Sequence, residues 1–477
     1  MAAPSAIDRT GTPGRVLATA ALGVVLPNLD LFIVNVALPS IASGMHTPDV
    51  GELSWILNAY TIVFAALLVP AGRMADRTSR RTGFLLGVAV FIAASAACAL
   101  SVSVPMLVGF RALQAVGAAM LVPTSLSLVL AAYEPERRAG AVRVWASTAS
   151  AAAAISPVIA GPLVLLSWRW VFLINLPIGI VVLLMGWRLL PDVEGRREPR
   201  PDAAGAGLLI VGIAALTLAL VRGGDWGWSS DRVLGLFVAT VAAMAAFAWR
   251  SARHPSPVLE IGLLRSRSFA LATLSTFLFA AALGAYLLSG VLWVQNVWHW
   301  SALRSGLAIA PGPALVPLWS IVAGKLMPRI GARPVVIAGC LAFAAALAWW
   351  VLAMRVQPNY LAGMLGGAAL TGVGVGLTVP TLFGMATAAL PPDRFATGSG
   401  AVNMIRQLGI AVGVAVLVAV IGTPAANAGA LHAFRHGWLV VAAISVACAL
   451  TGLLLRRPGR TTETGPAAAS PSGGRAR

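Results

Sequence analysis

The stretch Leu29–Pro39, which reads LDLFIVNVALP, is the one around which this chain is organised, because it places a carboxylate inside a long apolar segment. The surrounding apolar run extends from Val16 to Ala42, which is long enough to cross a membrane as a helix. A carboxylate at that depth costs on the order of 3 kcal/mol on insertion scales, so it is rarely retained without a role. Of the 16 acidic residues, Asp30 is the only one predicted to lie deep inside a span.

The composition of the whole chain is that of an integral membrane protein. Its 477 residues are 58% hydrophobic and 10% charged, and the mean hydropathy is +0.86. Soluble proteins carry about 25% charged residues, so a soluble globular fold is excluded. The first apolar run is longer than the core of a cleavable signal peptide, and other runs follow it, which identifies it as a first membrane span.

Fourteen apolar segments are predicted to cross the membrane as helices, so the expected fold class is all-α integral membrane. The predicted spans are residues 16–42, 53–72, 82–102, 105–131, 144–166, 168–190, 204–222, 232–250, 269–295, 302–324, 333–354, 358–389, 398–421 and 436–455. An even number of spans places both termini on the same side of the membrane.

The distribution of positive charge predicts which side that is. Of the 34 Lys and Arg residues, 26 fall on the side of the termini and 6 on the opposite side, while Arg111 and Arg406 lie within spans. Cytoplasmic loops carry such an excess, so both termini are expected in the cytoplasm of a multi-pass protein of the cell membrane. This placement explains the net charge of +18 without a nucleic-acid partner.

A repeated segment indicates two related halves. Gly72–Arg81 and Gly324–Arg333 each have a basic residue after the glycine and Arg at the sixth and tenth positions. Parallel repeats of six helices with a site between them are a known transporter plan. We therefore predict a cytoplasmic N-terminal tail (1–15), a six-helix bundle (16–190), a linker with two extra spans (191–268), a second six-helix bundle (269–455) and a disordered cytoplasmic tail (456–477).

Polar side chains inside the predicted spans are the candidate functional residues. Arg111 lies at a depth similar to that of Asp30, so the two are candidates for proton coupling; they either pair directly or Arg111 only braces neighbouring helices. Asn35 either binds substrate, with Asp30 facing a proton path, or makes packing hydrogen bonds. The candidates for the wall of a substrate cavity are Asn35, Tyr60, Gln114, Asn175, Gln295, Asn403 and Arg406.

Pro157, Gly161 and Pro162 indicate that the span 144–166 is a kinked helix that a neighbour can approach closely. Such a helix is suited to rocking against a partner, and ordinary small-residue packing is the alternative. The spans contain no nucleophile–base pair and no metal-ligand cluster, so we expect neither an enzyme nor a bound metal or cofactor.

These patterns resemble those of the major facilitator superfamily, and specifically of its fourteen-helix drug:proton antiporters. Gly72–Arg81 resembles the family's motif between the second and third spans, and Leu107–Gly117 resembles its span-four motif. Ser156–Gly161 resembles the span-five antiporter motif, with Ser156 and Ala160 in place of glycines. The two most family-specific segments are Leu29–Pro39 and Trp168–Pro177.

The resemblance implies proton-coupled export of small amphipathic compounds, such as drugs or antibiotics, by alternating access, with Asp30 as the coupling acid and Arg111 beside it. It also implies a cytoplasmic gate formed by Gly72, Asp76, Arg77 and Arg80. The expected partners are the small-molecule substrate, protons and membrane lipid, and the protein is expected to be a monomer. Two alternatives stay open: an importer or facilitator of a defined small metabolite, and a membrane sensor that does not transport.

The charge of the substrate can also be predicted from these spans. Because Asp30 is the only deep acid, at most one positive charge could be balanced in the site. We therefore expect neutral or monocationic substrates, with divalent cations poorly exported.

Overall fold

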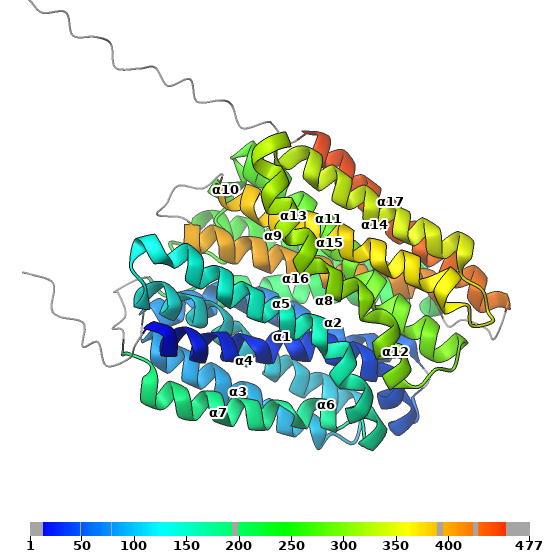
Figure 1. Ribbon diagram of the computed structural model, residues 1–477, viewed down its shortest axis with the longest axis horizontal. Helices are drawn as coiled ribbons and strands as arrows, with labels where there is room; N and C mark the ends of the chain where they lie inside the picture. Colours follow the sequence, from blue (N-terminus) through cyan, green and yellow to red (C-terminus); the bar gives the residue numbers. More distant parts are fainter. Residues whose placement is uncertain are drawn as a thin grey trace, which may run out of the picture.

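The computed structural model of the chain describes residues 13–47, 49–77, 79–192, 199–388, 395–422 and 428–454. These residues form long helices that lie side by side in one bundle (Figure 1). The helices are α1 (Pro13–Gly44), α2 (Val50–Arg77), α3 (Arg80–Ala99), α4 (Val104–Ala132), α5 (Pro135–Leu166), α6 (Trp170–Leu173), α7 (Asn175–Leu189), α8 (Ala203–Trp226), α9 (Asp231–Arg253), α10 (Ile261–Leu264), α11 (Arg267–Leu292), the π-helical η1 (Trp293–Val297), α12 (Ala302–Ile309), α13 (Pro311–Ile330), α14 (Ala332–Ala353), the π-helical η2 (Tyr360–Leu365), α15 (Gly366–Ala388), α16 (Phe395–Ile421) and α17 (Ala428–Leu454).

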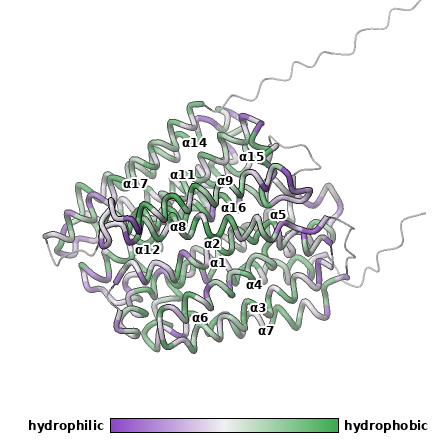
Figure 2. The backbone as a smooth tube through the Cα atoms, turned by 180° about the vertical axis from the view of Figure 1, so that it is seen from behind, coloured by the Kyte–Doolittle hydropathy of each residue, from purple (hydrophilic) through white to green (hydrophobic). Residues whose placement is uncertain are grey.

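The helices have the length and composition of membrane spans. In the described residues, 13 helical segments are long and apolar enough to cross a membrane, and a shorter apolar segment, Ala151–Leu166, belongs to the 32-residue helix α5. Hydrophobic residues occupy the middle of the bundle, and hydrophilic residues gather at its ends (Figure 2). The chain is therefore a multi-pass, all-α membrane protein, and each of the fourteen predicted spans corresponds to a helix or a pair of consecutive helices.

Several spans that were predicted as continuous helices are interrupted in the structure. The predicted span 302–324 is divided into α12 and α13 at Pro311, because proline has no N–H to continue the helical hydrogen bonds. The span 168–190 comprises α6 and α7, and the spans 269–295 and 358–389 each contain a π-helical turn. The short helix α10 lies in a segment for which no helix was predicted.

Both ends of the described chain lie at one face of the bundle, where α1 begins at Pro13 and α17 ends at Leu454 (Figure 1). We call this the terminal face, and we call the other end of the bundle, where α1 ends at Gly44, the opposite face. The two repeated segments occupy equivalent places at the terminal face, between α2 and α3 and between α13 and α14.

The helices α8 and α9 lie beside α2 and α16. α8 packs against both of those helices, and α9 packs mainly on α8. At the opposite face, Nη1 of Arg222 in α8 lies 2.6 Å from Oδ2 of Asp49, next to the start of α2. At the terminal face, Nη2 of Arg73 in α2 lies 2.9 Å from Oε1 of Glu260, which follows α9. Ion pairs therefore join the residue before α2 to α8 at the opposite face, and α2 to the segment after α9 at the terminal face.

Candidate functional site

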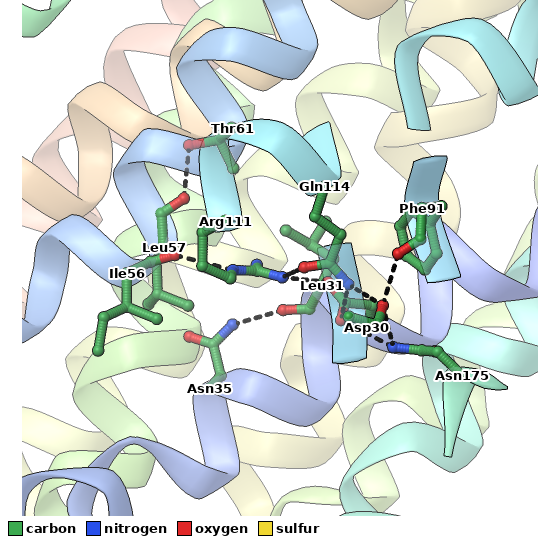
Figure 3. A network of polar contacts seen from close by, with 11 residues as sticks. Asp30, Leu31, Asn35, Ile56, Leu57, Thr61, Phe91, Arg111, Gln114 and Asn175 are labelled. Atoms are coloured by element: carbon green, nitrogen blue, oxygen red, sulfur yellow. Dashed lines mark hydrogen bonds and ion pairs between the residues drawn. The ribbon is translucent and has the colours of Figure 1, made fainter. Parts of the chain in front are cut away.

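A buried ion pair joins α1 to α4 in the centre of the bundle. Oδ2 of Asp30 accepts a hydrogen bond from Nη1 of Arg111, and both side chains are completely buried (Figure 3). The two helices pack against each other, which brings residues 81 positions apart in the chain into contact. Of the two possibilities left open by the sequence, direct pairing is therefore the one that the structure adopts.

Neutral polar side chains complete the surroundings of this carboxylate. Oδ1 of Asp30 accepts hydrogen bonds from Nε2 of Gln114 at 2.9 Å and from Nδ2 of Asn175 at 3.2 Å. The same two amides also donate to Oγ of Ser95, at 2.7 and 3.4 Å. Side chains from α1, α4 and α7 thus meet at one carboxylate, and Ser95 of α3 is linked to it through the two amides. We call these residues the Asp30 cluster: Asp30, Ser95, Arg111, Gln114 and Asn175.

The guanidinium of Arg111 is held by further contacts. Its Nε donates to the backbone oxygen of Ile56 in α2 at 3.1 Å, and its Nη1 donates to Oε1 of Gln114 at 2.5 Å. The guanidinium carbon lies 4.2 Å from the centre of the Tyr60 ring. A buried ion pair is sustained only when additional hydrogen bonds offset the lost hydration. The cluster supplies such bonds to both charges.

A cavity of about 510 Å³ lies between α1, α2, α4 and α5 on one side and α11, α13, α15 and α16 on the other. Its wall is mainly apolar. On α1, α2, α4, α5 and α16 the lining residues lie in the central and terminal-face parts of the helices, so the cavity extends from mid-depth toward the terminal face. A cavity of this volume accommodates a drug-sized molecule. The polar side chains on the wall are Asn28, Tyr60, Thr276, Tyr286, Ser320, Thr371, Asn403, Arg406 and Gln407.

Tyr60 lies between the Asp30 cluster and the cavity. It lines the cavity while its ring contacts Arg111, and its hydroxyl is buried without a hydrogen-bond partner in the described residues. Asp30 and Arg111 do not belong to the lining. One aromatic side chain therefore contacts both the buried ion pair and the cavity.

The residues predicted to form the cavity wall fall into three groups. Tyr60, Asn403 and Arg406 line the cavity. Gln114 and Asn175 instead belong to the Asp30 cluster.

The third group, Asn35 and Gln295, lies outside the cavity lining. Nδ2 of Asn35 donates to the backbone oxygen of Leu31 in its own helix at 2.9 Å, as Figure 3 shows. Nε2 of Gln295 donates to the backbone oxygen of Val36 at 2.9 Å, which links η1 to α1. A role for either side chain in binding substrate stays a prediction.

Close packing of α5 against α12 brings the two halves of the chain together toward the opposite face. A Cβ on Gly306 would lie 1.9 Å from the backbone oxygen of Pro157, and one on Gly161 would lie 2.3 Å from Cα of Leu303. Only glycine permits such an approach. Pro162 follows Gly161 in α5 and is exposed. The cavity is thus extended toward the terminal face and packed shut by α5 and α12 toward the opposite face.

Gly306→Ala is expected to shift the protein away from this conformation, because an added Cβ would collide with the backbone of α5. Spin labels at Leu166 and Leu352, which are exposed near the opposite face, should then report a larger fraction of long distances. The matched control is Gly207→Ala, since nothing lies within 4 Å of a Cβ at that position. An identical distance distribution for Gly306→Ala and Gly207→Ala would contradict the expectation.

The residues predicted to form a gate lie at the terminal face, where α2 ends and α3 begins. A Cβ on Gly72 would lie 3.2 Å from Cβ of Pro123 in α4, so these helices are close there. Arg77 is the last residue of α2 and Arg80 the first of α3, and each has an interaction partner. The side chain of Asp76 lies outside the described residues.

Ser95 is a member of the cluster that was not predicted. Its hydroxyl also donates to the backbone oxygen of Phe91 at 2.8 Å, which is the usual local bond of a serine in a membrane helix. A single serine in a run of small residues therefore carries no signal for the additional role of accepting hydrogen bonds from Gln114 and Asn175.

A helical bundle that encloses a drug-sized cavity next to a buried ion pair is typical of membrane transporters. The family model of the Major Facilitator Superfamily matches residues 20–414, and the chain belongs to this superfamily. It is therefore a transporter and not an enzyme, which confirms the prediction from the sequence.

Several curated proteins are similar to the chain. The multidrug resistance protein Stp of Mycobacterium tuberculosis is 34% identical over 404 residues, which cover 84% of this chain and 74% of that protein. The methylenomycin A resistance protein of Bacillus subtilis is 33% identical over 446 residues, or 92% of this chain and 94% of that protein. The tetracenomycin C resistance and export protein of Streptomyces glaucescens is 31% identical over 413 residues, or 85% and 76%.

Among solved structures, an auto-inhibited peptide transporter of the POT family has a TM-score of 0.67 at 18% identity. The match covers 95% of this chain and 99% of that chain. At this identity the likeness shows the fold alone, and it agrees with the all-helical fold predicted from the sequence.

Proposed function

We propose that this protein exports small amphipathic, drug-like compounds across the cytoplasmic membrane in exchange for protons. The observation that carries the proposal is the Asp30–Arg111 pair, which is completely buried and separated by Tyr60 from a cavity of about 510 Å³. The printed names of the relatives, a multidrug resistance protein and an antibiotic resistance and export protein, support the same direction and substrate class.

The terminal face is assigned to the cytoplasm in this proposal. The basis is the excess of Lys and Arg on the side of the termini, since cytoplasmic loops are enriched in these residues. The described conformation then has its cavity extended toward the cytoplasm, where an exporter collects its substrate. We assign the gate on this side to Gly72, Asp76, Arg77 and Arg80, in keeping with the prediction from the sequence.

Protonation of Asp30 is the proposed coupling event. The ionised carboxylate accepts hydrogen bonds from Arg111, Gln114 and Asn175. Adding a proton removes the negative charge, so the guanidinium loses its countercharge and must find other acceptors in a low-dielectric interior. Because the cluster unites side chains of α1, α3, α4 and α7 with the backbone of α2, this rearrangement changes how those helices pack.

Tyr60 is expected to transmit that change to the cavity. A cation over a desolvated aromatic ring contributes about 2 kcal/mol. Tyr60→Leu removes the ring, so proton-driven efflux should fall by about tenfold or more while substrate exchange without a gradient is retained. Tyr60→Phe keeps the ring and should remain coupled. The ratio of driven efflux to exchange in vesicles measures the effect.

Phe32→Leu is the matched control for Tyr60→Leu, because Phe32 also lines the cavity and its ring makes no cation–π contact with Arg111 in the described residues. It should alter binding but leave that ratio unchanged. Equal ratios for Tyr60→Leu and Phe32→Leu would show that Tyr60 is part of the wall only.

The proposed function is tested with inverted membrane vesicles and a chemically varied panel of amphipathic compounds. Vesicles that contain the protein should accumulate some of these compounds when the lumen is acidified, and a protonophore should abolish the accumulation. Movement out of the lumen instead would indicate an importer or a facilitator. An absence of protein-dependent flux for the whole panel would favour a sensor and contradict the proposal.

A further inference from the structure

Arg406 is a charged residue of the cavity wall that takes no part in the proposed proton-coupling step. It lies in α16, eleven residues after the first residue of that helix, Phe395, which corresponds to roughly 16 Å along the helix axis. The residue is therefore near mid-depth, and it lines the cavity. Within the part of the chain that the structure describes, no ion pair or hydrogen bond to another side chain engages its guanidinium.

The cavity offers this guanidinium no countercharge. Its lining residues include no aspartate or glutamate in the described part of the chain. Asp30, the acid that the sequence places deep in a span, has its carboxylate occupied by the Asp30 cluster and lies outside the lining. The described wall therefore carries one unbalanced positive charge, and charge in a low-dielectric site is costly unless it is paired.

The expectation of neutral or monocationic substrates assumed that Asp30 faces the substrate. In this conformation the assumption is wrong, because the carboxylate of Asp30 pairs with Arg111 and does not line the cavity. A cation in the cavity would meet Arg406 without a balancing acid in the described wall, so the electrostatic preference is reversed.

The geometry points to ionised aromatic weak acids, carrying one carboxylate or phenolate, as the preferred substrate class of this cavity. Guanidinium forms paired, charge-assisted hydrogen bonds with a carboxylate. The rings of Phe64, Phe279 and Tyr286 line the same cavity and suit an aromatic body. This inference rests on the proposed function in one respect, since it treats the cavity as the substrate site.

Three fluorescent probes with the same ring system test the inference: 9-anthracenecarboxylate, its neutral primary amide, and the cationic 9-(aminomethyl)anthracene. Binding to the purified full-length protein is measured by fluorescence anisotropy at neutral pH and without a proton gradient. The wild-type protein should bind the anion most tightly and the cation most weakly. Arg406→Gln should weaken anion binding by about tenfold to a hundredfold and change amide binding little.

Two further variants separate charge recognition from other effects. Arg406→Lys keeps the charge and should retain part of the anion preference. Arg232→Gln removes an exposed positive charge outside the cavity, so it controls for attraction by the net charge of +18 and should leave all three affinities unchanged.

A wild-type affinity for the cation that equals or exceeds the affinity for the anion would overturn the inference. This result does not depend on whether any variant folds. An equal loss of affinity for all three probes in Arg406→Gln would also overturn the inference, because such a loss would indicate that Arg406 only braces the helices. Failure of gradient-driven efflux with the charge preference intact would count against the proposed function alone.

Discussion

Asp30→Asn is expected to abolish accumulation of substrate against a gradient, reducing it to the level of vesicles that lack the protein. Asparagine has nearly the shape of aspartate but cannot exchange a proton, so the variant keeps the volume of the cluster and loses its titrating group together with the countercharge of Arg111. Substrate affinity should change by no more than about threefold, because Asp30 does not line the cavity. Efflux assays on inverted vesicles and binding assays on the purified protein measure the two effects separately.

Asp231→Asn is the matched control for this variant. Asp231 is exposed at the start of α9, and no ion pair involves it in the described residues. The control should transport like the wild-type protein. Asp30→Glu restores a carboxylate and should recover part of the driven transport. Full accumulation by Asp30→Asn would refute the role of Asp30 in coupling.

Arg111→Leu is expected to cause the second large effect, a loss of stability. Removing one partner of a buried ion pair leaves the other charge unpaired and costs about 3–5 kcal/mol. Here the variant would strand the carboxylate of Asp30 and release the backbone oxygen of Ile56. The midpoint of thermal unfolding in detergent should therefore fall strongly, and the yield of monodisperse protein with it.

The double variant Asp30→Asn/Arg111→Leu distinguishes the pair from its individual members. It contains no stranded charge, so most of the lost stability should return while proton-driven transport stays absent. Arg304→Leu is the control, since Arg304 is exposed near the opposite face and stacks on Trp300. A double variant as unstable as Arg111→Leu would mean that the arginine acts through packing and not through the charge of Asp30.

The fold could be predicted from the sequence because membrane spans can be recognised from the composition and length of apolar segments. Each of the fourteen apolar segments became a helix or a pair of helices, and the interruptions arose at local features such as Pro311. The depth of Asp30 and Arg111 was also predictable, because depth along a helix follows from residue counting at 1.5 Å per residue. Direct pairing was not, since it depends on which helices are neighbours.

The wall of the cavity was harder to predict because it depends on how each helix is rotated about its axis. Gln114 and Asn175 were expected on the wall, yet both point into the Asp30 cluster. Successive residues in an α-helix are about 100° apart, so a small change of rotation exchanges cavity for interior. Arg406 lines the cavity, as predicted. That no acid of the described wall pairs with it could not be predicted, because this depends on the direction in which the side chain of Asp30 points.

Substrate-induced proton movement is the direct measure of proton exchange at Asp30. Inverted vesicles with an acidic lumen and a pH-sensitive dye receive a compound that the protein accumulates. The lumen is expected to become less acidic on addition of the compound in wild-type vesicles but not in Asp30→Asn vesicles. Accumulation of the compound without any change in lumenal pH, or the same change in Asp30→Asn vesicles, would contradict proton exchange at Asp30.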